Sequence, residues 1–166
     1  DEADLAGRIG GIPDPFHAAL EEALVDLRDR WGAALLLDMH SMPPLGFQGG
    51  VPAPEFVLGD RFGASCHGAL MGSCFGYFSE MRRGVAHNRP YAGGYVLERH
   101  ARPREGIHAF QLEIDRSSYL DSRLAEPGKG FAAMVPLLTG LVRRLAGEVA
   151  EIARLNPARN WASAAE

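Results

Sequence analysis

The sequence predicts an α/β fold in which helices cover a sheet of at least partly parallel strands. Residues 33–39 form a short apolar run that stops at polar residues and a Pro-Pro pair, which suits a strand buried on both faces of a parallel sheet. Two longer segments, 15–31 and 130–155, repeat apolar residues at helical spacing. The predicted order of helix, strand, helix, strand, strand, helix is typical of layered α/β proteins.

The first half of the chain contains clear start and stop signals. A helix is expected over 15–31, because an Asp-Pro pair suits its N-terminus and Gly32 ends its pattern. Residues 1–12 are polar and glycine-rich and predict a loop or linker. The apolar strand over 33–39 leads into a loop over 42–55, rich in Gly and Pro, whose length is typical of functional segments.

The second half predicts two further helices and two further strands. A short apolar unit at 56–58 precedes a helix expected over 63–82, and a short strand runs from Gly84 into a tight loop. The next clear strand covers 107–115, and the long amphipathic helix covers 130–155. So few strands for so much helix indicate that the sheet is incomplete.

Length and composition set the broad class. The chain has 166 residues, 46% of them hydrophobic, which suits one globular domain. A net charge of −4 gives no footprint for nucleic acid or an anionic membrane, and no apolar run has the length of a membrane span. Cys66 and Cys74, eight residues apart in one expected helix, would be separated by about 12 Å, too far for a disulfide. We expect buried free thiols and a reducing, cytoplasmic location.

His40 is the first candidate for chemistry. It follows the apolar strand directly, together with Asp38 and Ser41, and ligands of open α/β sheets bind beyond the carboxyl ends of the strands. We interpret His40 as a metal ligand or an acid/base.

Glu113 is the second candidate, because a carboxylate within an apolar strand is costly without a role or a partner. Alternation along 107–115 places Gln111, Glu113 and Asp115 on one face. Glu113 is either a general base or a structural residue, paired with Arg116 or facing water at the strand end.

His40 and Glu113 together suggest zinc hydrolysis, but catalytic zinc needs about three protein ligands. The other five histidines form no recognised metal-binding pair: His17, His67, His87, His100 and His108. His17, four residues before Glu21, is expected on a solvated helix face, and His108 on the strand face opposite Glu113. The sequence therefore does not complete a metal site.

The segment from Asn88 to Tyr95 is a candidate substrate loop. Asn88 and Tyr91 offer hydrogen bonds, Arg89 suits a carboxylate, and Gly93 with Gly94 permits a close backbone approach. A simple tight turn explains the same residues. Arg61 likewise has two interpretations, either binding an anion or pairing with the neighbouring Asp60.

Four motifs resemble the N-formylglutamate amidohydrolase family in order and spacing over roughly 10–121. They read Leu-Asp-Met-His-Ser-Met-Pro (37–43), Leu-Gly-Asp-Arg-Phe-Gly (58–63), Asn-Arg-Pro-Tyr-Ala-Gly-Gly-Tyr (88–95) and Gln-Leu-Glu-Ile-Asp-Arg-Ser-Ser-Tyr-Leu-Asp (111–121).

The resemblance implies a zinc-carboxypeptidase-like fold, with a mixed, mainly parallel sheet between helices and Zn2+ at the C-terminal strand ends. It implies that His40 is a zinc ligand and that Glu113 is the general base that polarises the zinc-bound water. The remaining motif positions are assigned to the substrate pocket: Arg61, Asn88, Arg89, Tyr91, Gly94 and Arg116.

In the family that the chain resembles, the other zinc ligands, a histidine and an acidic residue, come from an earlier segment. This sequence lacks that segment and opens without Met. We therefore expect residues 1–166 to form a single, N-terminally truncated amidohydrolase-like domain, or a copy that has lost its metal site.

The expected function is zinc-dependent hydrolysis of the amide of a small N-formyl (or N-acyl) amino acid, first of all N-formylglutamate to formate and glutamate. Arg89 or Arg61 would hold a substrate carboxylate. One alternative is a metal-free, inactive binding or scaffold module. Another is a homo-oligomer or larger assembly in which a further chain pairs with the open edge of the sheet.

Overall fold

A four-stranded mixed sheet forms the centre of the protein. The computed structural model describes residues 11–46 and 53–155. The strands are β1 (Ala34–Met42), β2 (Phe56–Gly59), β3 (Val85–His87) and β4 (Ile107–Asp115), in the spatial order β1-β4-β2-β3. β1 runs parallel to β4 and β2 parallel to β3, while β2 and β4 are antiparallel. The prediction of a mixed, mainly parallel sheet is confirmed.

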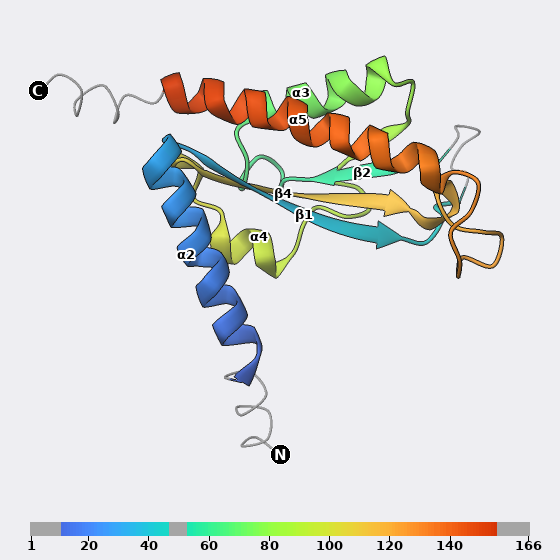
Figure 1. Ribbon diagram of the computed structural model, residues 1–166, viewed down its shortest axis with the longest axis horizontal. Helices are drawn as coiled ribbons and strands as arrows, with labels where there is room; N and C mark the ends of the chain where they lie inside the picture. Colours follow the sequence, from blue (N-terminus) through green and yellow to red (C-terminus); the bar gives the residue numbers. More distant parts are fainter. Residues whose placement is uncertain (1–10, 47–52, 156–166) are drawn as a thin grey trace, which may run out of the picture.

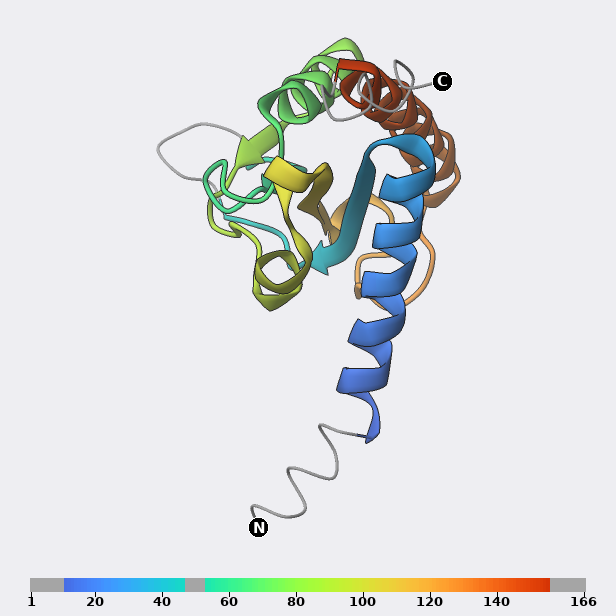
Figure 2. The same cartoon turned by 90° about the vertical axis from the view of Figure 1, so that its left-hand side faces the viewer.

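Helices cover both faces of this sheet (Figures 1 and 2). They are α2 (Pro13–Trp31), α3 (Gly68–Glu80), α4 (Tyr95–His100) and α5 (Phe131–Leu155), with 3-10 turns η1 (Pro103–Glu105) and η2 (Arg116–Ser118). The helices α3 and α5 lie side by side on one face, and α2 and α4 lie on the other. Among the described helices, none combines the length and apolar character needed to cross a bilayer.

The main core fills the space between the sheet and the α3–α5 pair. Alternate residues of β2 and β4 point to this side and are almost fully buried, and α3 and α5 supply the facing side chains. Phe56 stacks on Phe78 with ring centroids 4.5 Å apart. The largest contributors are Phe56, Leu58, Leu70, Phe78, Phe110, Leu112 and Leu141. Burial of each such side chain contributes roughly 1.5–3 kcal/mol.

The opposite face changes character along the strands. At the N-terminal ends of β1 and β4, Ala34 and Ile107 pack on Leu24 of α2 in a small apolar cluster. Further along, the same face carries Asp38 and His40 on β1, in register with Gln111 and Glu113 on β4. The apolar contacts of α2 thus end where the polar part of the sheet begins.

Two element boundaries differ from the expectations by more than two residues. β1 continues beyond 39 through His40 to Met42, because its ladder with β4 extends as far as Met42 and Asp115. The helix expected over 63–82 begins only at Gly68, because a turn closed by Ser65 N–H on the Asp60 carbonyl precedes it.

The sequence pattern placed both cysteines in one helix, and this expectation is wrong. Cys66 precedes α3, whereas Cys74 lies within it. Both are buried free thiols, as expected. Burial raises the pKa of Cys74 to about 12 and also raises the pKa of Cys66, so both thiols stay protonated near neutral pH.

The helix α4 was not predicted, and it changes the environment of His17. This residue is buried rather than on a solvated face, and its Nδ1 lies 2.8 Å from Nε2 of His100 at the end of α4. Burial, reinforced by the neighbouring His17, lowers the pKa of His100. Glu21, the expected neighbour of His17, pairs instead with Arg102 at 2.8 Å.

His108 lies on the α3–α5 side of β4, as alternation predicted, and is 1% exposed. Neither of its ring nitrogens has a hydrogen-bond partner within the described part of the chain. Burial, with a smaller contribution from the charge of His67, lowers its pKa to about 4. The folded state therefore disfavours the protonated imidazole.

This environment predicts a pH-dependent stability. Between pH about 6.5, where an unfolded histidine titrates, and about 4, the unfolded chain gains a proton that the native His108 does not, so stability falls as pH falls. The free energy of unfolding should drop by about 2–3 kcal/mol more in the wild type than in His108→Leu across this window. Urea titrations at several pH values measure the difference, and parallel curves would contradict the prediction.

Candidate functional site

Two matched pairs of polar residues define the candidate site, at the carboxyl ends of the central parallel strands. Asp38 and His40 lie two residues apart on β1, and Gln111 and Glu113 lie two residues apart on β4. The parallel register places Asp38 beside Gln111 and His40 beside Glu113. Because registered residues share a sheet face, all four side chains leave the same side. The structure therefore brings His40 and Glu113 together, as a shared site requires.

Each pair is joined by a contact along its own strand. Nε2 of His40 lies 3.0 Å from Oδ2 of Asp38. The side-chain amide of Gln111 donates to Oε1 of Glu113 at 2.6 Å. The side chain of His40 is 46% exposed, whereas Glu113 is only 7% exposed. The site therefore combines an accessible imidazole with a buried carboxylate.

The structural alternatives for Glu113 do not describe its environment. It is buried rather than facing water at the strand end. Arg116 points elsewhere and donates from Nε to the hydroxyl of Ser41 at 3.2 Å. Among the described residues the hydrogen-bond partner of Glu113 is Gln111, so this carboxylate is held by a neutral amide.

The strand β2 brings the loop after β3 close to these residues. Gly59 is in antiparallel register with Gln111. A Cβ atom at Gly59 would lie 2.6 Å from the carbonyl carbon of Ala92 and 2.7 Å from the backbone nitrogen of Gly93. The close backbone approach expected for this loop is thus real, and the absent side chain of Gly59 makes it possible. Gly94 then forms the N-cap of α4.

Asn88 holds the base of this loop. It is buried, and its Oδ1 accepts from the backbone N–H of Asp60 at 3.0 Å and of Phe62 at 3.4 Å. Its Nδ2 donates to Oδ1 of Asp60 at 2.8 Å, an atom that also lies 3.0 Å from Nε2 of His87. The structure thus gives Asn88 contacts that position the substrate-loop candidate, and its role toward a substrate stays a prediction.

The arginines of the motifs differ in whether they already form ion pairs. Arg61 pairs with Glu98 of α4 at 3.4 Å rather than with Asp60, whose carboxylate binds Asn88. Its backbone N–H donates to the Ala92 carbonyl at 2.8 Å. Arg89 is exposed and makes no ion pair within the described residues, so its guanidinium is available to a ligand.

Tyr91 is half-buried in the same loop. Arg116, by contrast, lies at the β1 side of the sheet through its contact with Ser41. The predicted substrate residues therefore fall into a loop group over β2 and one separate cation next to β1.

The described residues do not fit a complete zinc centre. They contain no group of three His, Cys, Asp or Glu side chains arranged to hold a metal ion. His40 supplies one imidazole, one nitrogen of which faces Asp38, whereas catalytic zinc takes about three protein ligands.

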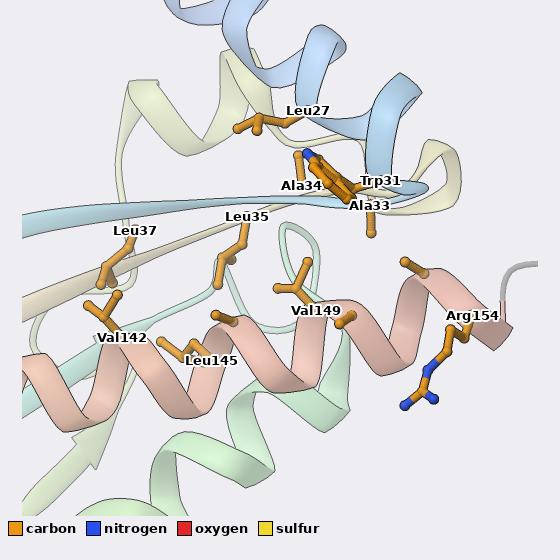
Figure 3. A pocket seen from close by; sticks show the side chains of 13 residues that line it. Leu27, Trp31, Ala33, Ala34, Leu35, Leu37, Val142, Leu145, Val149 and Arg154 are labelled. Carbon is orange, nitrogen blue, oxygen red and sulfur yellow. The ribbon is translucent and has the colours of Figure 1, made fainter.

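A separate apolar groove of about 570 Å3 lies along β1, between the end of α2 and α5 (Figure 3). Leu35 and Leu37 point from β1 toward Val142 and Leu145 of α5, and Trp31 lies across the strand on α2. The groove lies away from the polar strand ends and offers a charged ligand only Arg154 among its lining residues. It does not suit an anionic amino-acid derivative.

Sequence reasoning noted Asp38 and Gln111 without giving either a role. The sequence does contain a signal for them, because each lies two residues before a candidate residue. On a strand this spacing places Asp38 on the same face as His40 and Gln111 on the same face as Glu113. The contact between His17 and His100 had no local signal, because these residues lie 83 positions apart.

Comparison with known proteins identifies relatives of this chain. A model of the N-formylglutamate amidohydrolase family matches residues 1–120. The chain is 37% identical over 112 residues to an N-formylglutamate deformylase of Pseudomonas putida, covering 64% of this chain and 41% of the relative. It is 33% identical over 114 residues to an N-formylglutamate deformylase of Pseudomonas aeruginosa, covering 66% and 42%. The chain thus spans about two fifths of the length of these curated relatives.

Solved structures agree with these matches. The crystal structure of an N-formylglutamate amidohydrolase from Ralstonia eutropha superposes with a TM-score of 0.70 at 34% identity, over 92% of this chain and 54% of the other. A protein from Agrobacterium tumefaciens shares the fold with a TM-score of 0.63 at 21% identity, over 89% of this chain and 56% of that one.

The contact at Gly59 makes a prediction for the loop. Gly59→Ala would drive a Cβ into the backbone of Ala92 and Gly93, so the loop must shift and stability should fall by about 1–3 kcal/mol. Gly72→Ala is the matched control, because nothing lies within 4 Å of its added Cβ and alanine favours the helix α3. Thermal unfolding of both variants measures the effect, and equal behaviour would show that the loop does not rest on β2.

Proposed function

This chain belongs to the N-formylglutamate amidohydrolase family, and on that premise we propose that it hydrolyses the amide of a small N-formyl (or N-acyl) amino acid. N-formylglutamate is the first candidate substrate, because two curated relatives are named N-formylglutamate deformylase. The products would be formate and the free amino acid. Two buried free cysteines fit a reducing, cytoplasmic setting for this activity.

The observation that supports the proposal most directly is the environment of Glu113. It is a buried carboxylate in register with His40, at the carboxyl end of a parallel strand pair. Gln111 occupies Oε1, and Oε2 has no hydrogen-bond partner among the described residues. A general base needs such an oxygen within reach of the water that it activates.

In the proposed reaction Glu113 accepts a proton from water while the water oxygen bonds to the formyl carbon. The carbon–nitrogen bond then breaks as the proton passes from Glu113 to the leaving amino nitrogen. Formate and the amino acid carry away all the atoms of substrate and water, and Glu113 returns to its carboxylate form. This is general acid–base catalysis by one residue, typically worth about 10²–10⁴-fold in rate.

We assign substrate recognition to the loop over β2. Arg89 is exposed and uncommitted, which suits it to a substrate carboxylate, while Tyr91 and the backbone near Gly94 line the same loop. Arg61 is a second candidate cation, although an ion pair with Glu98 already holds it. Arg116 would act from the β1 side.

We further propose that His40 contributes one ligand to a Zn2+ ion whose other ligands lie outside the described residues, in an upstream segment or on another chain. A bound zinc ion would supply Lewis-acid activation of the amide and the water.

A metal-free, inactive binding module is the second candidate function. One observation favours it: the described residues hold no group of three His, Cys, Asp or Glu side chains arranged to hold a metal ion. The presence of both His40 and Glu113 in register favours the hydrolase instead.

Formate release and metal content test both candidates. The purified chain should release formate from N-formylglutamate faster than it cleaves N-acetylglutamate or a dipeptide, and Glu113→Gln should reduce that rate about 10²–10⁴-fold. Glu22→Gln, an exposed change on α2, is the matched control and should leave the rate unchanged. A wild type that releases no formate and binds no zinc, both alone and when extended by an upstream segment, would favour the binding module.

A further inference from the structure

Gln111 makes a hydrogen bond to Glu113, but the proposed function assigns Gln111 no role of its own. It lies two residues before Glu113 on β4, is buried, and donates from its amide to Oε1 at 2.6 Å. Buried carboxylates commonly pair with a cation, but here the described partner is neutral. The glutamate is therefore fixed in direction while its negative charge is not cancelled by a neighbouring cation.

The surroundings of Gln111 explain how its own side chain is held. In the sheet it lies between Asp38 of β1 and Gly59 of β2. Gly59 has no side chain, and the backbone of Ala92 and Gly93 covers it closely. Gln111 thus occupies a confined position between a polar strand neighbour and the loop assigned to substrate binding.

We propose that Gln111 is a positioning residue for Glu113: its amide fixes one carboxylate oxygen and leaves the other to take the proton of the attacking water. This inference rests on the proposed role of Glu113 as general base. An arginine or lysine at the same place would also orient the carboxylate, but its charge would weaken the carboxylate as a base. A neutral donor orients without that cost.

A purely structural role is the competing explanation, in which Gln111 only satisfies a buried carboxylate. The two roles differ in what they change. A structural donor affects stability, whereas a positioning donor affects kcat more than KM and is partly restored by a residue that keeps the amide.

The contact itself is tested without activity, by NMR of the Gln111 side-chain amide in the 15N-labelled chain. One amide proton should resonate downfield in the wild type and move upfield in Glu113→Ala, with circular dichroism confirming that the variant folds. An amide proton whose chemical shift is the same in the wild type and in Glu113→Ala would overturn the proposal.

The role is tested by formate release from N-formylglutamate. Gln111→Met, which keeps the length but removes the donor, should lower kcat about 10- to 100-fold with KM changed less than about twofold. Gln111→Asn keeps an amide on a shorter side chain, and its kcat should lie between that of the wild type and that of Gln111→Met. Full kcat in a folded Met variant would sink the positioning role while the proposed function stands. A wild type that releases no formate would instead count against the proposed function, and the amide resonance would still decide whether the contact exists.

Discussion

The parallel pairing of β1 and β4 is the interaction on which the rest of the structure depends. Nine residues of each strand are in register, from Ala34 beside Ile107 to Met42 beside Asp115. The N-terminal part of this ladder anchors α2 through apolar contacts, and the C-terminal part aligns His40 with Glu113. A shift of one residue would turn every polar side chain of one strand toward the opposite face. The same register of β1 and β4 therefore sets both the packing of α2 and the alignment of the candidate site residues.

The two faces of the sheet divide the work between stability and chemistry. The face toward α3 and α5 is almost entirely apolar and supplies most of the buried core. The opposite face is apolar only where α2 packs, and its polar end stays uncovered enough to leave His40 half exposed. Among the described strands β1 is paired on one side only, and an apolar groove runs along it.

The residues of the candidate site are held in place by their neighbours as much as by their own strands. Asn88 ties the turn after β2 through Asp60, and Gly59 lets the following loop lie against the sheet. Gln111 and Asp38 contact Glu113 and His40 in the same way, each from two residues earlier. Motif residues that look equivalent in a sequence thus separate into those available to a ligand, such as Arg89, and those committed to the scaffold.

The sequence by itself determined the α/β class, the main helices and strands, the strand-end place of His40 and the shared face of Gln111 and Glu113. These features follow from local patterns of period 2 and 3.6 and from Gly and Pro breakers, which one stretch of chain carries alone. Only the tertiary structure decided that α4 forms and that His17 is buried next to His100 of that helix. It also decided that Arg61 pairs with Glu98 and that Cys66 lies outside α3. Finally, it decided that the amide of Gln111, rather than Arg116, holds Glu113. Those outcomes depend on which of several competing partners packing brings within reach, often tens of residues away, and no local pattern encodes that choice.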